Sequence, residues 1–527
     1  MKNKFKLSSL LLSMLVLASC NANNTSSTDT DTENSQSSSV ESEITINPGY
    51  TRFDVTTKND SPIVGFGAQM DTDIFMPQNA MTEEDERIWE ERIKEMNLKY
   101  TRIKYFPEFL ERENDNANSD SFDFSSKGVD TECAEMKALY KVLDICEKYD
   151  IKVDLSLSGC WHWFKSYDGK YTKSWLANDS EALKDCWVTG PTDFDEYAEN
   201  ISACLDLLIN QKGYTCIWGI SNVSESFFDA NRVKSWDDYV LSCKKIDEKL
   251  RKDGLRDKVK FFGTSECGNN PKYYDEEFST VADIFDVCGN GNYMWDYRCV
   301  NESIQTYFEE MIAVMKKYGK KDYAISEFCQ GLHFTDAVNK TDIDDYSAGL
   351  YISRFCIEAA KAGVTAFDHY ILGDCLFGSY IHTMGLWMYR DSNLKNENYI
   401  SWAAHPEFYF YRLICKYTDT GAYAYKVDQE LVGPYADIDR DLTAVAFELS
   451  ENKWSYMIAN TSNEIKKIAI VNKNAKLSKM NCYKVTESAI PEDRNCLPFE
   501  SYKEIDASSN VAYLSVPANG FLVVSNK

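Results

Sequence analysis

The sequence predicts an α/β chain in which a barrel of eight parallel strands is followed by an all-β sandwich. Between residues 60 and 415, short apolar runs alternate with amphipathic helical patterns, which is typical of a parallel α/β fold. After residue 416 the helical patterns stop, and short alternating runs separated by polar turns indicate a β-sandwich. Eight apolar runs in the first part predict a closed (β/α)8 TIM barrel. These strands are expected at 63–67, 100–105, 152–157, 215–221, 259–263, 284–288, 323–325 and 364–369.

Helices are expected between the strands, because apolar residues recur there at helical spacing. Thr82 is a candidate N-cap for a helix whose apolar stripe runs over 88–96. Further stripes run over 136–146 and 194–208, and Ser235 opens a fourth helix. We interpret all of these stripes as core.

The chain divides into four predicted segments. Residues 1–19 are interpreted as a signal peptide, 20–45 as a disordered tether, 46–415 as the barrel and 416–527 as the sandwich. The tether is almost entirely Ser, Thr, Asn, Asp and Glu, and such a stretch buries too little apolar surface to offset its ordering entropy. The sandwich strands are expected at 442–447, 454–459, 468–471, 512–516 and 521–524.

A basic and then apolar leader opens the chain. Lys2, Lys4 and Lys6 precede an apolar run over 7–17, well short of the ~20 residues that cross a bilayer, so it is interpreted as an export signal. The Leu-Ala-Ser-Cys that follows resembles the bacterial lipobox, and this implies that Cys20 becomes the acylated first residue. We therefore expect an exported protein, lipid-anchored to the bacterial cell membrane and facing outward, with plain secretion as the alternative.

Charge and cysteine usage limit the partners. The formal net charge of −26 argues against nucleic acid and against an anionic membrane surface, so membrane contact is expected only through the lipid anchor. The 17 cysteines include no CxxC spacing and the five histidines are scattered, so no metal site is predicted. Most cysteines are interpreted as small core residues, and Cys482 with Cys496 is the most plausible disulfide.

Carboxylates and aromatic rings gather where the predicted barrel strands end. Active groups of such barrels lie at the C-terminal ends of the strands and in the loops after them. Candidate substrate-binding residues are therefore taken from these places. They are Gln69 and Asp71 after the first strand, Arg102 on the second, Trp161 and Trp163 after the third, Tyr293 and Trp295 after the sixth, and His369 at the eighth.

Two glutamates at strand ends suit the hydrolysis of a glycosidic bond. That reaction needs an acid to protonate the leaving oxygen and a carboxylate to trap or stabilise the cationic sugar, ~5 Å apart in the retaining version. Glu225 follows the fourth strand and Glu327 ends the seventh, so the two can face one another across the barrel mouth. Glu266, after the fifth strand, is a rival acid. Tryptophan rings offer platforms for a sugar, although they are also common in cores. No cofactor is expected, and the expected partner is a carbohydrate.

Four short segments together resemble glycoside hydrolase clan A, most closely family 30 and less closely family 39. They are the Gly-Phe-Gly run at 65–67, Arg102, the Ile-Ser-Glu-Phe run at 325–328 and the Ser-Val-Pro-Ala-Asn-Gly-Phe run at 515–521. The resemblance covers about residues 60 to 525. It implies a retaining glycosidase with Glu327 as nucleophile and Glu225 as acid/base.

The sequence departs from the clan at two strands. The fourth reads Ser224-Glu225-Ser226 where the clan has Asn-Glu-Pro, and Asn222 is displaced by two residues. The sixth has Asn290 and Asn292, and lacks a histidine before Tyr293. A catalytically inactive barrel that binds glycans at the cell surface is therefore kept as the alternative.

Overall fold

The computed structural model describes residues 44–114, 120–161, 173–178, 188–222, 235–267, 271–293, 303–329, 345–377, 380–388, 401–430, 439–450, 452–475, 479–496, 501–506 and 510–527, with side chains left out at 264–267, 271–273, 303, 377 and 380–382. Residues 46–527 form one compact unit. Cys20 and the predicted signal peptide lie outside the described residues.

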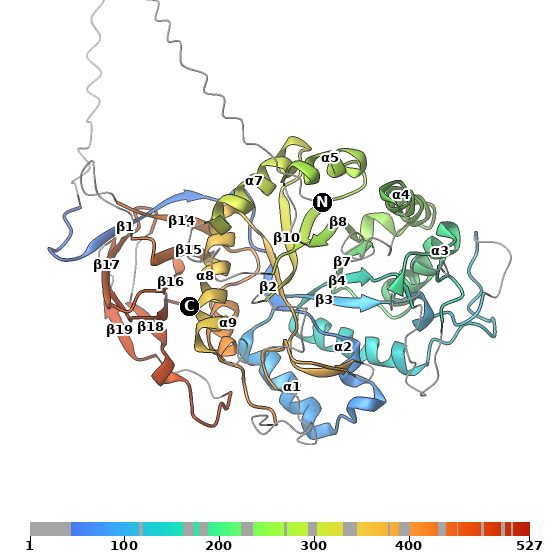
Figure 1. Ribbon diagram of the computed structural model, residues 1–527, viewed down its shortest axis with the longest axis horizontal. Coiled ribbons are helices and arrows are strands. Elements are labelled where there is room, and N and C mark those ends of the chain that lie inside the picture. Colours follow the sequence, from blue (N-terminus) through green and yellow to red (C-terminus); the bar gives the residue numbers. More distant parts are fainter. Residues whose placement is uncertain are drawn as a thin grey trace, which may run out of the picture. The chain divides into compact units, whose positions relative to one another are not determined.

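Eight parallel strands close into a barrel, as predicted (Figure 1). Each overlaps one of the eight predicted segments, and the hydrogen-bonded order is β10-β11-β2-β3-β4-β7-β8-β9. The strands are β2 (Gly65–Ala68), β3 (Tyr100–Tyr105), β4 (Lys152–Leu157), β7 (Ile217–Asn222), β8 (Lys260–Cys267), β9 (Val287–Gly291), β10 (Asp322–Phe328) and β11 (Ala366–His369).

The Gly-Phe-Gly run has a packing reason. A Cβ atom on Gly67 would lie 1.5 Å from the carbonyl oxygen of Tyr100, so β2 approaches β3 more closely than any side chain permits.

Helices surround the barrel, and the predicted caps form (Figure 1). Thr82 accepts a hydrogen bond from the Asp85 backbone N–H in a capping box, and the Ser235 side chain accepts one from the Asp238 backbone N–H at the start of α4. The helices are α1 (Glu83–Met96), α2 (Ala134–Tyr149), α3 (Phe194–Leu205, continued by a π-helical segment at Asp206–Gln211), α4 (Trp236–Lys252), α5 (Pro271–Val281), α7 (Ser303–Lys317), α8 (Tyr346–Ala362) and α9 (Pro406–Lys416).

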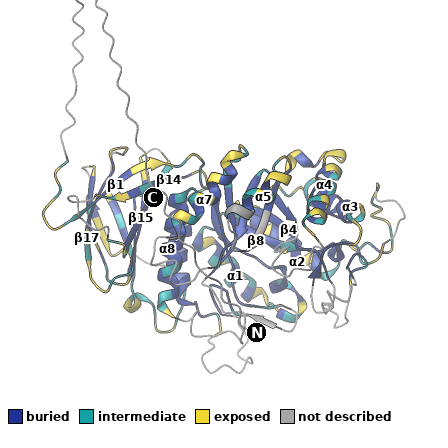
Figure 2. Cartoon of the chain, turned by 45° about the horizontal axis from the view of Figure 1, so that its top comes forward, coloured by how far each residue is buried: buried dark blue, intermediate teal, exposed yellow. Residues whose placement is uncertain are grey.

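A separate, mostly antiparallel sheet of nine strands follows the barrel, in the order β19-β18-β21-β16-β15-β14-β1-β17-β20. One face of all nine strands contributes to a single apolar core, whereas the opposite face of the central strands packs against α8 and α9 (Figure 2). The strands are β1 (Thr51–Lys58), β14 (Tyr423–Gln429), β15 (Leu442–Ser450), β16 (Lys453–Asn460), β17 (Lys466–Val471), β18 (Lys479–Val485), β19 (Lys503–Asp506), β20 (Val511–Val516) and β21 (Gly520–Ser525).

One boundary differs from the prediction. Residues 46–415 were expected to form the barrel, but β1 pairs antiparallel with β14 and parallel with β17. The N-terminal segment therefore completes the C-terminal sheet before the chain enters the barrel. Because both partners of β1 lie more than 300 residues further along the chain, no local pattern reveals this pairing.

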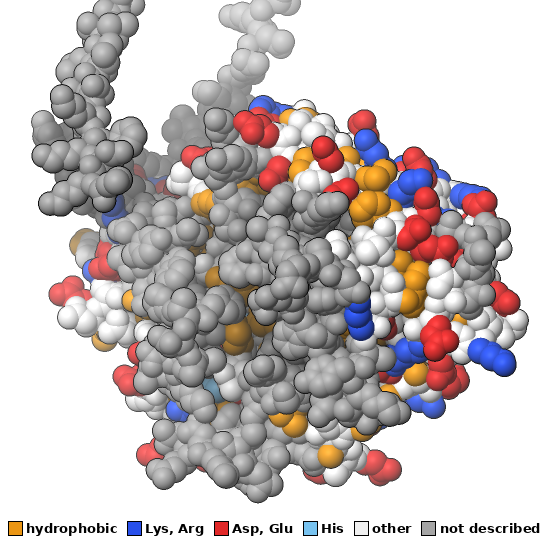
Figure 3. Space-filling model, turned by 45° about the vertical axis from the view of Figure 1, so that its right-hand side comes forward, with side chains coloured by type: hydrophobic (Ala, Val, Ile, Leu, Met, Phe, Trp, Pro, Cys, Tyr) orange, Lys and Arg blue, Asp and Glu red, His pale blue; other side chains and the backbone are white. Residues whose placement is uncertain are grey.

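The thiols that the structure describes are unpaired. Cys482 and Cys496 are both free, so the predicted disulfide is wrong, and of the described cysteines all but Cys133 and Cys496 are buried. Within the described part, no group of three or more His, Cys, Asp or Glu side chains could hold a metal ion. No described helix combines the length and the apolar character needed to cross a membrane. Acidic and basic side chains are interspersed over the described surface in Figure 3.

Candidate active site

The inside of the barrel changes from apolar to polar along its axis. Alternate side chains of each strand point inward, and those near the N-terminal strand ends form a small apolar cluster. Nearer the C-terminal ends of the strands, the inward side chains are charged or polar and contact one another. The cluster contains Val64, Tyr100, Phe262, Val287, Ala324 and Ala366, and the polar rows contain Arg102, Asp154, Ser156, Ser221, Glu327 and Asp368.

Glu327 lies on β10 near the C-terminal end of the barrel and is only 5% exposed. One carboxylate oxygen pairs with the guanidinium of Arg102, and the other accepts a 2.6 Å hydrogen bond from the Tyr293 hydroxyl. Burial alone would raise the pKa of Glu327, but the charges of Arg102 and Lys104 and the bond from Tyr293 hold this pKa below its ordinary value. This environment therefore favours the ionised carboxylate of Glu327.

Arg102 organises the polar rows from β3, three strands away from β10 in the barrel order. Its side chain is fully buried; Nη2 donates to Ser156 Oγ at 3.1 Å and Nη1 to Gln69 Oε1 at 3.3 Å. Gln69 in turn donates to Asp71 Oδ1 at 2.8 Å. The predicted residues Gln69, Asp71, Arg102, Tyr293 and Glu327 are thus joined in one network. Within this network, the Arg102 guanidinium binds the carboxylate of Glu327. Arg102 therefore holds a protein group and does not offer the open position to substrate that was predicted for it.

Two further carboxyl groups face Arg102, and neither was among the predicted site residues. Ser221 Oγ donates to Asp154 Oδ2 at 3.1 Å, and the backbone N–H of Arg102 donates to Asp368 Oδ1 at 3.2 Å. Burial raises the pKa of Asp154 to about 6 and that of Asp368 well above its usual range, although Arg102 lowers both. An acid inside an apolar strand run, at an inward position, is the signal that could have found them.

His369 does not face the barrel interior, and its predicted contact with substrate is not supported. Its ring is fully buried between Phe328 and Tyr411, with centroid distances of 5.5 and 5.4 Å, and Nε2 lies 3.4 Å from Glu407 Oε1 on α9. Side chains alternate along a strand, so Asp368 points inward and His369 outward to the helix layer. The inward group at the end of β11 is therefore the aspartate.

Trp161 is a core residue in this structure and not an open sugar platform. It lies on a short strand, β5 (Cys160–Trp161), paired with β6 (Val188–Thr189), and its ring is 1% exposed. Phe106 and Phe109 pack against it at 5.3 and 5.6 Å between ring centroids. The prediction for Trp161 is corrected accordingly.

Several predicted site residues cannot be placed. Glu225, Trp163 and Trp295 lie outside the described residues. Glu266 lies on β8, where its backbone pairs with Asn290, but its side chain is not described.

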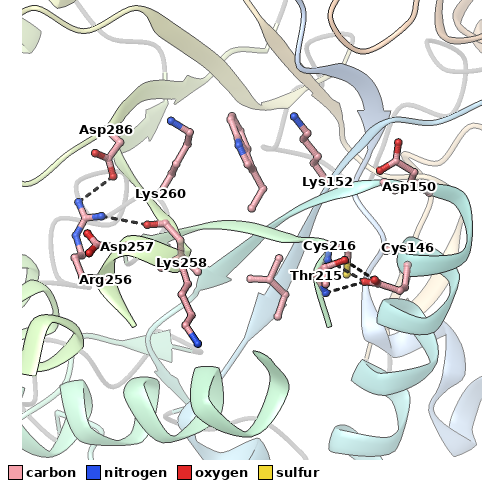
Figure 4. Close-up of a pocket in the computed structure, with 15 residues that line it drawn as sticks. Cys146, Asp150, Lys152, Thr215, Cys216, Arg256, Asp257, Lys258, Lys260 and Asp286 are labelled. Atoms are coloured by element: carbon pink, nitrogen blue, oxygen red, sulfur yellow. Dashed lines mark hydrogen bonds and ion pairs between the residues drawn. The ribbon is translucent and has the colours of Figure 1, made fainter. Parts of the chain in front are cut away.

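A cavity of about 520 Å³ lies at the opposite end of the barrel, where β4, β7, β8 and β9 begin (Figure 4). Lys152 and Lys260 stand on either side of Trp218, with Nζ 5.5 and 5.9 Å from the ring centroid. Arg256 also lines the cavity and forms ion pairs with Asp247 and Asp286. Because barrel enzymes use the C-terminal strand ends, this cavity is not part of the candidate active site.

Comparison with known proteins supports the same architecture. No protein-family model and no curated protein matches the sequence. A GH30 endoxylanase from Clostridium papyrosolvens C71 superposes with a TM-score of 0.60 at 12% identity, covering 90% of this chain and 99% of that chain. The chain has the fold of family 30 and family 39 glycoside hydrolases.

Two further structures cover 90% of this chain and 99% of their own. They are an α-L-arabinofuranosidase from Thermotoga maritima, with a TM-score of 0.59 at 12% identity, and a GH39 β-xylosidase from Caulobacter crescentus, with 0.55 at 11%. The predicted clan A architecture, a barrel with a C-terminal sheet domain, is therefore confirmed. At identities this low, structural similarity establishes the fold alone, so the reaction must be argued from the chemistry of the side chains.

Proposed function

We propose that this protein is a retaining glycoside hydrolase that cleaves an oligo- or polysaccharide with Glu327 as nucleophile. The observation that carries the proposal is the environment of Glu327, a buried carboxylate near the C-terminal end of a barrel strand, held ionised by Arg102 and oriented by Tyr293. A carboxylate fixed in this way can attack the anomeric carbon of a sugar and form a covalent glycosyl-enzyme.

The partner acid is proposed to be Glu225. It follows β7, and the order β7-β8-β9-β10 puts the C-terminal ends of β7 and β10 three strands apart at the same rim of the barrel. In the first step Glu225 gives its proton to the leaving oxygen. In the second it takes a proton from water, and the resulting attack releases the sugar from Glu327. Glu266 on the intervening β8 remains the rival for this role.

The chemistry can be tested with aryl glycosides and polysaccharides that include xylans, β-1,6-glucans and arabinans, chosen from the structural neighbours. On a substrate that wild type cleaves, Glu327→Gln is expected to lower kcat by at least about 10³-fold, because an amide cannot form the glycosyl-enzyme. A matched control is Glu407→Gln, whose buried carboxyl lies 3.4 Å from His369 in the helix layer and should leave kcat nearly unchanged.

Covalent trapping gives an independent measurement. With an activated 2-deoxy-2-fluoro glycoside of the cleaved sugar, mass spectrometry should find the adduct on the peptide containing Glu327. Unchanged turnover in Glu327→Gln would remove this residue from the mechanism. Binding of glycans without cleavage across the whole panel would favour the glycan-binding alternative, for which the altered Ser224-Glu225-Ser226 motif is the supporting feature.

We further propose that Cys20 anchors the enzyme to the outer face of the cell membrane, on the strength of the leader and the Leu-Ala-Ser-Cys motif. Metabolic labelling with a fatty acid should then mark the wild-type protein and leave Cys20→Ser unlabelled.

A further inference from the structure

Lys104 lies one inward position beyond Arg102 on β3, closer to the mouth of the barrel. The strand alternation places Tyr100, Arg102 and Lys104 on one face, and Lys104 is paired in register with Ser156 of β4. Ser156 is the residue that accepts from Arg102 Nη2. Lys104 therefore continues the polar rows and is half-buried within them.

Two tyrosine side chains connect Lys104 to the candidate nucleophile. Lys104 Nζ lies 3.5 Å from the Tyr370 hydroxyl and 5.1 Å from the centre of the Tyr370 ring. That ring meets Tyr293 edge to face at 6.4 Å, and Tyr293 donates to Glu327. Lys104 is thus linked to Glu327 through the contacting side chains of Tyr370 and Tyr293.

The charge of Arg102 does not belong to Glu327 alone. Asp154 and Asp368 face the same guanidinium, so each carboxyl that ionises there competes for its charge. The other titratable or charged groups around Glu327 are Lys104 on β3, Tyr293 after β9, Cys329 on the chain after β10, Tyr370 after β11, and Asp71, which is joined through Gln69. Among the described groups around Glu327, Lys104 is thus the second cation beside Arg102.

We infer that Lys104 is a positioning residue for the proposed reaction, whose ammonium group supplies a second positive charge that keeps Glu327 in its anionic, attacking form. This inference rests on the proposed function. Lys104 acts through Glu327 and needs no contact with the sugar. The electrostatics agree with this role, because the positive charge of Lys104 helps to lower the pKa of Glu327.

The test is the pH profile of kcat/KM, whose acid limb reports protonation of the nucleophile in the free enzyme. In Lys104→Met the limb is expected at higher pH, so that kcat/KM on the acid side falls about threefold to tenfold relative to wild type and stays within about twofold near neutrality. Lys104→Arg keeps the charge and should restore the wild-type limb. Lys152→Met removes one lysine charge at the far end of the same barrel and should leave the profile unchanged.

A second readout does not depend on turnover. In protein labelled with ¹³C at the glutamate carboxyl, the resonance missing from Glu327→Gln identifies Glu327, and its titration midpoint should move to higher pH in Lys104→Met. A midpoint that does not move overturns the role of Lys104, whether or not a substrate has been found. A midpoint that moves in a protein that cleaves no glycan would support Lys104 and reject the hydrolase proposal, so the two failures are distinguishable. Circular dichroism spectra that superpose with wild type confirm that each variant is folded.

Discussion

The two ends of the barrel interior use the same strands for opposite purposes. On β3 the inward residue changes from Tyr100 to Arg102 within one strand repeat, and on β11 it changes from Ala366 to Asp368. The N-terminal end thereby gains apolar packing, whereas the C-terminal end buries an arginine among three carboxyl groups. Burying a charge costs free energy unless the group is paired and hydrogen-bonded. The polar end is therefore expected to contribute less to the stability of the fold than the apolar end.

This comparison also explains the different states of the three carboxyl groups. Glu327 receives the ion pair of Arg102 together with the bond from Tyr293, and its pKa falls. Asp154 and Asp368 share the same cation, but burial dominates and raises their pKa values. One guanidinium cannot hold three neighbouring carboxylates ionised, and the geometry assigns its charge to Glu327, the group that the proposed reaction needs.

Arg102→Met should have the largest effect, because it removes the group on which the polar end depends. Glu327 would lose its ion pair and the pKa of its carboxyl would rise, so we expect a loss of at least about 10³-fold in kcat/KM near neutral pH. Leaving buried carboxylates without their cation should also destabilise the fold by about 3–5 kcal/mol. Steady-state kinetics and urea unfolding measure the two effects, and near-wild-type activity would show that Arg102 does not control Glu327.

Phe262→Ala tests the other end of the comparison. Phe262 is a buried member of the apolar cluster and packs edge to face on Trp218 at 5.1 Å. Truncating the ring should cost about 3–5 kcal/mol of stability and leave kcat within about twofold of wild type, because the ring belongs to the apolar cluster and not to the network around Glu327. Urea unfolding followed by kinetics at a permissive temperature gives both numbers. A large loss of kcat in folded enzyme would show that the two ends are not independent.

The sequence predicts the barrel strands better than the strands of the C-terminal sheet. All eight barrel strands were found because each is a short apolar run between helical stripes. By contrast, β1, β14, β18 and β19 were not predicted. The segment of β1 has a half-exposed pattern and pairs with strands far along the chain, so its role depends on tertiary contacts that local spacing does not encode.

The site shows a similar limit. Gln69, Asp71, Arg102, Tyr293 and Glu327 meet because strand ends converge in a barrel, a rule that needs only approximate boundaries. Choosing between neighbouring side chains needs the register to one residue. The choice of His369 over Asp368 failed for this reason, since a shift of one position exchanges the interior for the helix layer.

Asp154→Asn should have the smallest effect of the three, and it shows most directly how burial opposes charge at the polar end. The pKa of Asp154 is raised by burial from an ordinary 3.8 to about 6 in the folded protein. A raised carboxyl pKa means that the folded state binds the proton more tightly, so its stabilising contribution is complete below about pH 4 and is lost as pH rises through about 6.

From this site alone, the free energy of unfolding should fall by up to about 3 kcal/mol between pH 4 and pH 7. An asparagine cannot ionise, so the difference in unfolding free energy between Asp154→Asn and wild type should grow in favour of the variant over that range. Urea unfolding at several pH values measures the difference. Asp144→Asn, in an exposed carboxyl that accepts from Tyr214, is the matched control. If the difference in unfolding free energy between Asp154→Asn and wild type does not change with pH, Asp154 stays ionised over this range. Arg102 would then share its charge among the carboxylates more evenly than its contacts with Glu327 indicate.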